Sequence, residues 1–386
     1  MAQYSYGQLK EDYESFSNEF AIVRVNRKKI SDSRQKFIVG DLTVELTCGF
    51  EASIATFSIY NCFDQEKGCF LVDELKKYIA MGSQVEISLG YAALVKPVFV
   101  GFIARTAFCY GRGELAHVSI MCMDAKGAMM AGCYCRQLIS KYYSDAVNEI
   151  LEKISYAKLQ GTEIIKSLRI SRTPDKTTGN SDDVLSLEMT SESDYDFIVR
   201  AAKKFNYEFY IDCGELVFRR AMANASTIIE LEAGNGIMNM EAAYDLTGVI
   251  ESAIVRGVDA DKGRVIEAEV KNTNKLSIGS YAKNIVKGKK SVNIDATVSS
   301  SDEAQYRAGY LMNHAAYSLG RLECETIGLP EIKPGNYITI KGFGKPAENT
   351  YYIMDVVHSL DQYSGYRTKI TACTDSVEKE LKNGFI

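Results

Sequence analysis

Strand-like segments dominate the first third of the chain. Most of them have apolar side chains at alternate positions, and they cover residues 21–25, 42–46, 52–59 and 85–89. This period of two is typical of strands in an antiparallel sheet with one buried face. One helical candidate, residues 71–80, has apolar residues at four-residue spacing. We therefore predict an antiparallel β-barrel over residues 20–125, after an N-terminal extension of residues 1–19.

Part of this pattern recurs near the end of the chain. The stretches MGSQVEISLGY and KPGNYITIKGFG each begin an alternating strand after a turn glycine. After each glycine come a strand that begins with an aromatic residue, a second turn glycine and an aspartate, with gaps that agree within one residue. The matched pairs are Gly82 and Gly335, Phe99 and Tyr352, Gly113 and Gly365, and Asp124 and Asp375. Four matched features in one order predict a duplicated module.

The second module is less compact in sequence than the first. We predict that it covers residues 241–258 and 301–375, with 249–256 as its first strand and a polar insertion at 259–300. A second helical candidate, 302–317, precedes Gly335 as the first one precedes Gly82, and we interpret the two as equivalent.

An α+β domain is predicted between the two modules, over residues 126–240. Ser144 is a candidate cap for a helix that runs to about residue 154, and Ser193 begins a second helix that ends at Phe205. A hairpin follows, and Gly214 supplies the positive φ that its turn requires. Residues 376–386 form a C-terminal tail. The fold class is therefore α+β, mostly β.

Charge and hydropathy argue against two classes of partner. The 386 residues carry a net charge of −5, and the only dense basic runs, 24–29 and 287–290, are interpreted as solvated turns. We therefore predict no nucleic-acid recognition. No apolar run approaches the ~18 residues of a membrane span, and the first residues lack the apolar core of a signal peptide. We predict synthesis in the cytoplasm and no stable membrane insertion.

The cysteine pattern does not indicate a metal centre. There are ten cysteines, and the closest pair, Cys133 and Cys135, has no second pair at zinc-ligand spacing and no histidine nearby. Other cysteines, such as Cys109, Cys122 and Cys373, lie within apolar strand patterns. We predict reduced, structural cysteines and neither a metal nor a cofactor.

No catalytic constellation is visible in the sequence. Of the three histidines, His117 and His314 are interpreted as packing or surface residues, and His358 as the end of a strand, at the place that Arg105 holds in the first module. A cell-wall hydrolase would need two carboxylates that flank the scissile bond. Glu192 and Asp196 are candidates, but they stand at a helix start, where acidic residues are favoured anyway. We predict no catalytic residues.

The order of these segments resembles a known family. SDYDFIVRAAKKFNYEFYIDCGELVFR, followed by GLPEIKPGNYITIKGFG and YYIMDVVHSLDQYSGYRTKITA, is similar to the baseplate hub proteins of contractile tails. These include phage tail hubs, late-control D proteins and the N-terminal part of the valine-glycine-repeat spike proteins of type VI secretion. The resemblance extends over about residues 20–375 and implies two barrels like those of the inner tube protein.

The resemblance also implies a function and partners. A homotrimer would present six barrels and join a hexameric inner tube protein to a trimeric spike, within the baseplate of a virion or extracellular particle that contains other baseplate proteins. The family's longer members continue into a spike, whereas this chain ends at Ile386, shortly after Asp375. We therefore expect a separate spike protein, which the tail 376–386 contacts.

Several alternatives remain open from sequence. The particle is a phage tail, a tailocin or a related injection system, and the residues that bind tube and spike are unknown. A distal tail component of a non-contractile phage would use the same barrels, and a tail-associated cell-wall hydrolase is a third possibility.

Overall fold

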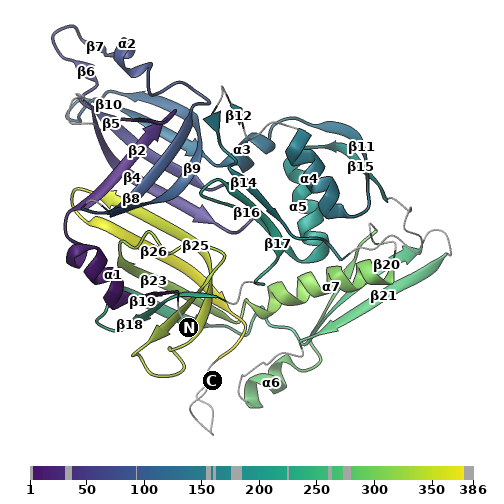
Figure 1. The fold of residues 1–386 in the computed structure, drawn as a ribbon. Coiled ribbons are helices and arrows are strands. Elements are labelled where there is room, and N and C mark those ends of the chain that lie inside the picture. The colour runs from purple at the N-terminus through teal and green to yellow at the C-terminus, as the bar shows by residue number, and fades with distance from the viewer. Residues whose placement is uncertain are drawn as a thin grey trace.

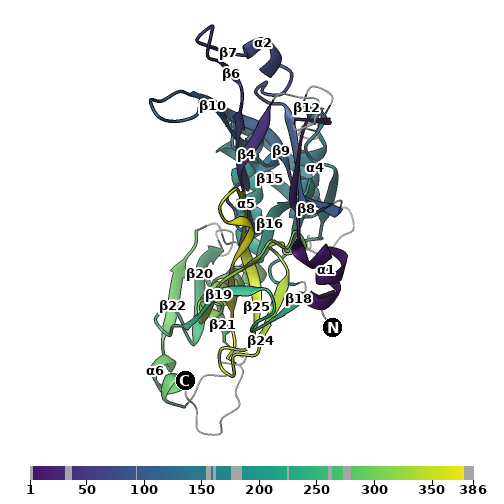
Figure 2. The same ribbon diagram turned by 90° about the vertical axis from the view of Figure 1, so that its left-hand side faces the viewer.

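The computed structural model describes residues 3–30, 37–92, 94–153, 158–159, 162–174, 185–223, 226–259, 263–272, 280–296, 298 and 300–377. Two β-barrels lie side by side, with an α+β domain and a separate sheet covered by a helix along one flank (Figure 1). The molecule is elongated, with α2 at one end and α6 at the other (Figure 2). No helix in these ranges is long and apolar enough to span a membrane.

The first barrel is antiparallel, with strand order β2-β8-β9-β10-β5-β4. Its strands are β2 (Glu19–Val25), β3 (Lys28–Lys29), β4 (Ile38–Thr47), β5 (Ile54–Tyr60), β8 (Gln84–Tyr91), β9 (Leu94–Cys109) and β10 (His117–Met123). An excursion between β5 and β8 holds β6 (Phe63–Asp64), β7 (Cys69–Phe70) and α2 (Val72–Leu75). The predicted helix 71–80 is therefore only one turn long, and no side chain caps its start.

The second barrel repeats this order as β18-β24-β25-β26-β23-β19. Its strands are β18 (Thr227–Glu232), β19 (Ile237–Tyr244), β23 (Gly320–Ile327), β24 (Tyr337–Lys341), β25 (Thr350–Asp361) and β26 (Gly365–Thr374). The N-terminal extension lies beside it as β1 (Tyr4–Ser5), α1 (Tyr6–Asp12) and a 3₁₀ turn (Glu14–Phe16). The one change of direction is that β18 pairs parallel with β24, whereas β2 pairs antiparallel with β8.

Equivalent backbone hydrogen bonds confirm the two turn glycines as counterparts. The N–H of Gly82 donates to the carbonyl of Ile103 (2.9 Å), and the N–H of Gly335 donates to that of Ile353 (3.0 Å). The predicted match of Phe99 with Tyr352 is wrong. Tyr352 faces the first residue of β24, and the residue in that position of the first barrel is Phe102, because β8 is longer than β24.

The strand predicted to begin the second barrel belongs elsewhere. β20 (Ser252–Asp259) pairs with β21 (Arg264–Lys271) and β22 (Lys290–Ile294) in a separate three-stranded sheet, next to α6 (Ser280–Val286). The predicted helix 302–317 is confirmed as α7 (Ser301–Ala316), but its buried alanines pack on this sheet. It is therefore not the counterpart of α2. The barrel begins instead with β18 and β19, most of which the sequence prediction assigned to the preceding domain.

In its described residues, the α+β domain contains three helices and several short sheets. Its elements are α3 (Ala125–Met129), β11 (Tyr134–Ser140), α4 (Tyr143–Lys153), β12 (Lys158–Leu159), β13 (Thr162–Glu163), β14 (Ser167–Ile170), β15 (Leu185–Glu192), α5 (Asp194–Phe205), β16 (Tyr207–Asp212) and β17 (Glu215–Arg220). The predicted cap of α5 is confirmed, because Ser193 and Asp196 form a capping box. Ser144 lies inside α4 instead of capping it, and its hydroxyl accepts a hydrogen bond from the N–H of Thr173.

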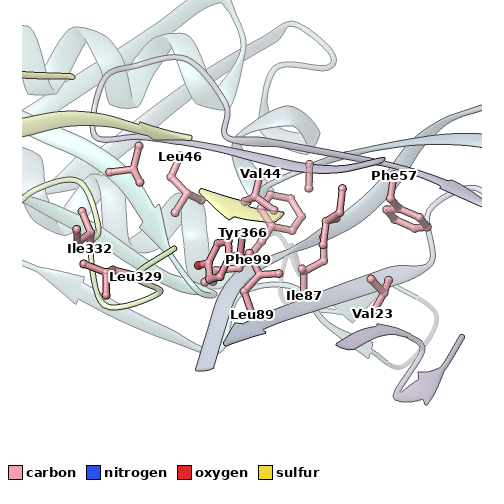
Figure 3. Close-up of a cluster of buried hydrophobic side chains, with 14 of the residues drawn as sticks. Val23, Val44, Leu46, Phe57, Ile87, Leu89, Phe99, Leu329, Ile332 and Tyr366 are labelled. Atoms are coloured by element: carbon pink, nitrogen blue, oxygen red, sulfur yellow. The ribbon is translucent and has the colours of Figure 1, made fainter. Parts of the chain in front are cut away.

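One shared strand joins the two barrels. The second half of β25, Asp355–Leu360, pairs antiparallel with Leu42–Thr47 of β4, while its first half pairs with β24. The two barrels also share one hydrophobic core, in which Val44 and Leu46 lie near Leu329 and Tyr366 (Figure 3). The joint is therefore a continuous sheet over a continuous core.

Candidate functional site: the junction of the barrels

The residues considered in the sequence for catalysis have structural contacts. Both carboxylate oxygens of Glu192 bind the Arg200 guanidinium, at 2.6 and 3.2 Å. The Asp196 carboxylate accepts hydrogen bonds from the N–H and the hydroxyl of Ser193. Both acids therefore hold α5 in place. Among the described residues, no group of three or more His, Cys, Asp and Glu side chains lies where it could hold a metal ion.

His358 is a core residue, which corrects the interpretation of it as a strand end. Its side chain is fully buried in the middle of β25, and Nδ1 lies 3.0 Å from Thr368 Oγ1 and 3.1 Å from the Tyr366 hydroxyl. Burial lowers its pKa to about 3. Its counterpart in the first barrel is Phe108 instead of Arg105, because the bulges of the two strands align in that register.

A buried loop, residues 328–336 between β23 and β24, contacts the N-terminal extension, the first barrel and the α+β domain. We call it the junction loop. Its Glu331 is 3% exposed, and Oε1 accepts hydrogen bonds from the Tyr13 hydroxyl (2.5 Å) and Lys96 Nζ (2.8 Å). One carboxylate thereby connects the second barrel to the N-terminal extension and to the first barrel. Burial, together with Glu331, raises the pKa of Tyr13 well above its usual value.

The end of the junction loop contacts a buried ion pair of the α+β domain. Arg219 Nη2 donates to the carbonyl of Gly335 (2.7 Å), while Arg219 Nε donates to Glu208 Oε1 (2.5 Å). The other oxygen of Glu208 accepts from the hydroxyl of Tyr352 in β25 (2.5 Å). Burial raises the pKa of Glu208, although Arg219 opposes this effect. Both carboxylate oxygens have partners, which an ion pair needs when water is excluded.

Lys333 makes the third polar contact of the junction loop. Its Nζ donates to Asp212 Oδ1 (2.9 Å) and lies 3.4 Å from the Cys213 thiol, at the turn of the predicted hairpin. Burial raises the pKa of Cys213 to about 12, so the thiol is protonated at neutral pH. This side chain is therefore a structural contact instead of a nucleophile.

The junction loop thus holds three parts of the chain in one fixed arrangement. Its ion pairs and hydrogen bonds are buried or half-buried and reach the extension, the first barrel and the α+β domain. Such an arrangement supplies orientation and rigidity and contains no exposed reactive group. The signal in the sequence is a glutamate and a lysine within the otherwise apolar and turn-forming GLPEIKPGN, but a local pattern of this kind does not predict their roles.

Gly335 provides a direct test of how tightly this junction is packed. Its φ is +80°, and a Cβ there would lie 2.5 Å from the Tyr210 hydroxyl. We expect Gly335→Ala to lower the free energy of unfolding by ~3 kcal/mol, from backbone strain plus the steric clash. Urea denaturation measures this change.

Gly344→Ala is the matched control for that substitution. Gly344 has a similar φ of +74°, but a Cβ there would meet nothing within 4 Å. Its loss of stability should be ~1 kcal/mol, from backbone strain alone. Equal losses in the two variants would show that the junction has room for an added methyl group.

A groove of about 810 Å³ opens where the first barrel does not close. It lies between the outer edge of β2 and the start of β4 and is lined by Phe20, Val39, Leu42 and Leu360. In the second barrel, the corresponding edge of β18 is covered by β1 of the N-terminal extension. The groove also has three carboxylates in its lining, those of Asp41, Glu114 and Asp361.

Solved structures of other proteins have the same fold as this chain. The 43 kDa tail protein of prophage MuSo2 from Shewanella oneidensis has a TM-score of 0.66 at 11% identity, over 93% of this chain and 99% of the other. A tail protein from Neisseria meningitidis MC58 has a TM-score of 0.64 at 12% identity, over 93% and 97%. An E. coli component of the type VI secretion system has a TM-score of 0.52 at 11% identity, over 94% and 78%. At these identities the likeness establishes a common fold.

Sequence comparison identifies a family directly. No curated protein matches the chain. A family model described as the Alg8 N-terminal domain matches residues 53–362. Because this match spans more than half of the sequence, the chain belongs to the Alg8 N-terminal domain family.

Proposed function

We propose that this protein is a structural baseplate hub of a contractile injection particle, which acts as a trimeric adaptor between a hexameric inner tube and a trimeric spike. The observation that carries this proposal is the pair of equivalent barrels, with the same strand order, joined side by side in one chain. Three such chains contain six equivalent barrels. A duplicated module is the simplest way for a threefold assembly to match a sixfold one.

The likeness to solved structures supports a role in a tail. Two structures of the same fold are described as tail proteins, and the E. coli structure is described as similar to the T4 bacteriophage tail proteins gp27 and gp5. The buried junction loop supports the same role, because a symmetry adaptor must hold its two barrels at a fixed angle. On this proposal the protein has no enzymatic activity, and its partners are the inner tube protein, a separate spike protein and other baseplate proteins.

We propose domain boundaries that follow the sheets. Residues 19–124 and 226–244 with 320–375 are the two ring-forming barrels, and 125–223 is the α+β domain that braces them. The insertion 245–319 forms its own three-stranded sheet, while its helix α7 lies against α5 through Tyr306 and Phe205 and reaches the second barrel where Tyr317 contacts Tyr337 (Figure 1). Most of the proposed spike-contacting tail, residues 378–386, lies outside the described residues, so its role stays a prediction.

Light scattering of the purified protein tests the proposal. We expect three times the single-chain mass of 42.9 kDa, either for the protein alone or after addition of the spike protein. A stable dimer would contradict the adaptor, because two chains cannot match sixfold symmetry with four barrels. A monomer that persists in the presence of the spike protein would contradict it as well.

A further inference from the structure

The strand that joins the barrels has a close counterpart in the first barrel. β25 carries a bulge at Met354, next to the point where it leaves β24, and β9 carries one at Ala104 next to the end of β8. Superposing the two bulges aligns the strands residue by residue. Asp355–Leu360 of β25 therefore correspond to residues 105–110, which are the last five residues of β9 and the following Tyr110.

The partner strand of that joint also has a counterpart. Val44 faces Ala55 of the next strand, and Ala242 faces Leu322, which occupies the same position in the second barrel. Residues 43–47 of the first barrel therefore correspond to 241–245 of the second. The chain thus contains two copies of each half of the joint, but it forms the joint once.

The unused halves are open edges in the described part of the chain. Beyond β8, the outer part of β9 pairs only with β10, and β19 pairs only with β23. Side chains on the unused β9 edge are exposed where their counterparts are buried, because Phe108 is 48% exposed and His358 is 0% exposed. Open edges with exposed aromatic side chains are sites of strand addition.

From these edges we infer that β19 of one copy pairs antiparallel with the outer half of β9 in a neighbouring copy, in the register that β4 and β25 use within the chain. This inference rests on the proposed function and names the surface through which the copies join. Transferring the observed pairs of β4 with β25 to their counterparts gives Asp245 opposite Arg105, Ala242 opposite Phe108, and Glu241 opposite Cys109.

The side chains that this register brings together are complementary in size and charge. On the core face, the large Phe108 meets the small Ala242, and the large Tyr244 meets the small Thr106. At the end of the paired segment, the Arg105 guanidinium meets the Asp245 carboxylate. Both charges are exposed in the single chain, and neither has an ion-pair partner among the described residues. Opposite charges directly across two strands stabilise the pair.

The contact joins two different surfaces, the β19 edge of one copy and the β9 edge of the next. After one such contact forms, each of the two copies still has one unpaired edge. Contacts of this type form closed rings or open filaments, depending on the rotation between copies. The rotation within the chain, from one barrel to the next, would be repeated between chains. Three copies close when each step is one sixth of a turn.

A single cysteine substitution tests the register. Glu241→Cys places a thiol opposite the native Cys109 of the neighbouring copy, where residues face each other at about 5 Å between Cβ atoms, close to disulfide reach. After mild oxidation we expect covalent dimers and trimers on a non-reducing gel, which a reductant converts to single chains. The matched control is Glu241→Cys with Cys109→Ser, which should give only the background of the other exposed cysteines.

The outcomes separate the inference from the function on which it rests. A protein of trimeric mass whose crosslinking does not depend on Cys109 would overturn the pairing and leave the trimeric hub intact. A Cys109-dependent ladder beyond three chains would support the pairing and contradict the threefold adaptor. A protein that stays monomeric and without crosslinks even after addition of the spike protein would overturn both.

Charge reversal gives an independent readout. Arg105→Asp places two carboxylates opposite each other, and we expect the trimer to dissociate at a protein concentration about tenfold higher than the wild type. The double variant Arg105→Asp with Asp245→Arg should restore assembly. An unchanged dissociation concentration in the single variant would overturn the register.

Discussion

Arg219→Met is expected to lower the free energy of unfolding by ~3–5 kcal/mol, because it leaves the Glu208 carboxylate buried without its counter-charge. Glu208 is 6% exposed and Arg219 9% exposed, so water cannot replace the lost partner. The substitution also removes the donor to the Gly335 carbonyl in the junction loop. Urea denaturation at neutral pH, followed by circular dichroism, measures the change.

Two further variants make this result specific. Arg220→Met, at the exposed neighbouring position, should change stability by no more than ~0.5 kcal/mol. The double variant Glu208→Gln with Arg219→Met should be less destabilised than the sum of its two single variants, because it removes the uncompensated charge. A loss of less than ~1 kcal/mol in Arg219→Met would mean that the junction tolerates an unpaired carboxylate.

The stability of the protein is expected to fall in mild acid because of His358. Its pKa in the folded protein is about 3, against 6.5 when unfolded. Above pH 6.5 the imidazole is neutral in both states and has no effect. As the pH falls from 6.5 towards 3, only the unfolded state takes up the proton, so stability is lost progressively across that window. Between pH 7.5 and 5.0 the loss from this one group is ~2 kcal/mol.

His358→Phe isolates this contribution. It introduces the residue that the first barrel has in the equivalent position, Phe108. The variant is expected to be less stable at pH 7.5, because Thr368 and Tyr366 lose a hydrogen-bond partner. Its stability should then change by ~2 kcal/mol less than that of the wild type between pH 7.5 and 5.0. His314→Gln, at an exposed position on α7, should reproduce the wild-type difference. An unchanged pH dependence in His358→Phe would place the acid sensitivity elsewhere.

Much of the fold follows from local sequence patterns. Period-two alternation identified the barrel strands, and Ser193, Asp196 and Gly214 marked a helix start and a turn that the structure confirms. The turn glycines Gly82 and Gly335 revealed the duplication, because a positive φ and a fixed backbone hydrogen bond recur at both. These features depend on residues close together in the chain.

The errors in the prediction have a common physical origin. β20 has the same alternation as a barrel strand, and nothing in its sequence shows that its buried face packs against α7. Equal spacing also misaligned Phe99 with Tyr352, because a longer hairpin in one copy shifts the strand without disturbing its pattern. A strand's pattern reports that one face is buried, but not which partner covers it.

The junction could not be predicted from sequence for a related reason. Its polar contacts join residues far apart in the chain, such as Tyr13 with Glu331, 318 positions away. A buried carboxylate has the same letter as an exposed one, and its environment is created only by the folded neighbours. The structural roles of Glu331 and Lys333 in GLPEIKPGN can be recognised only when the strands on both sides of the loop are in place.

The strand shared by the barrels has a consequence for biosynthesis. The edge of β4 has no partner strand until β25 has been synthesised, and most of the chain lies between these two strands. At ~5–20 residues per second, its synthesis takes roughly 15 to 60 s. Throughout that time the first barrel has an uncovered edge, open to strands of other nascent chains. Its own strands are synthesised first, but the first barrel is completed only after β25 has been synthesised.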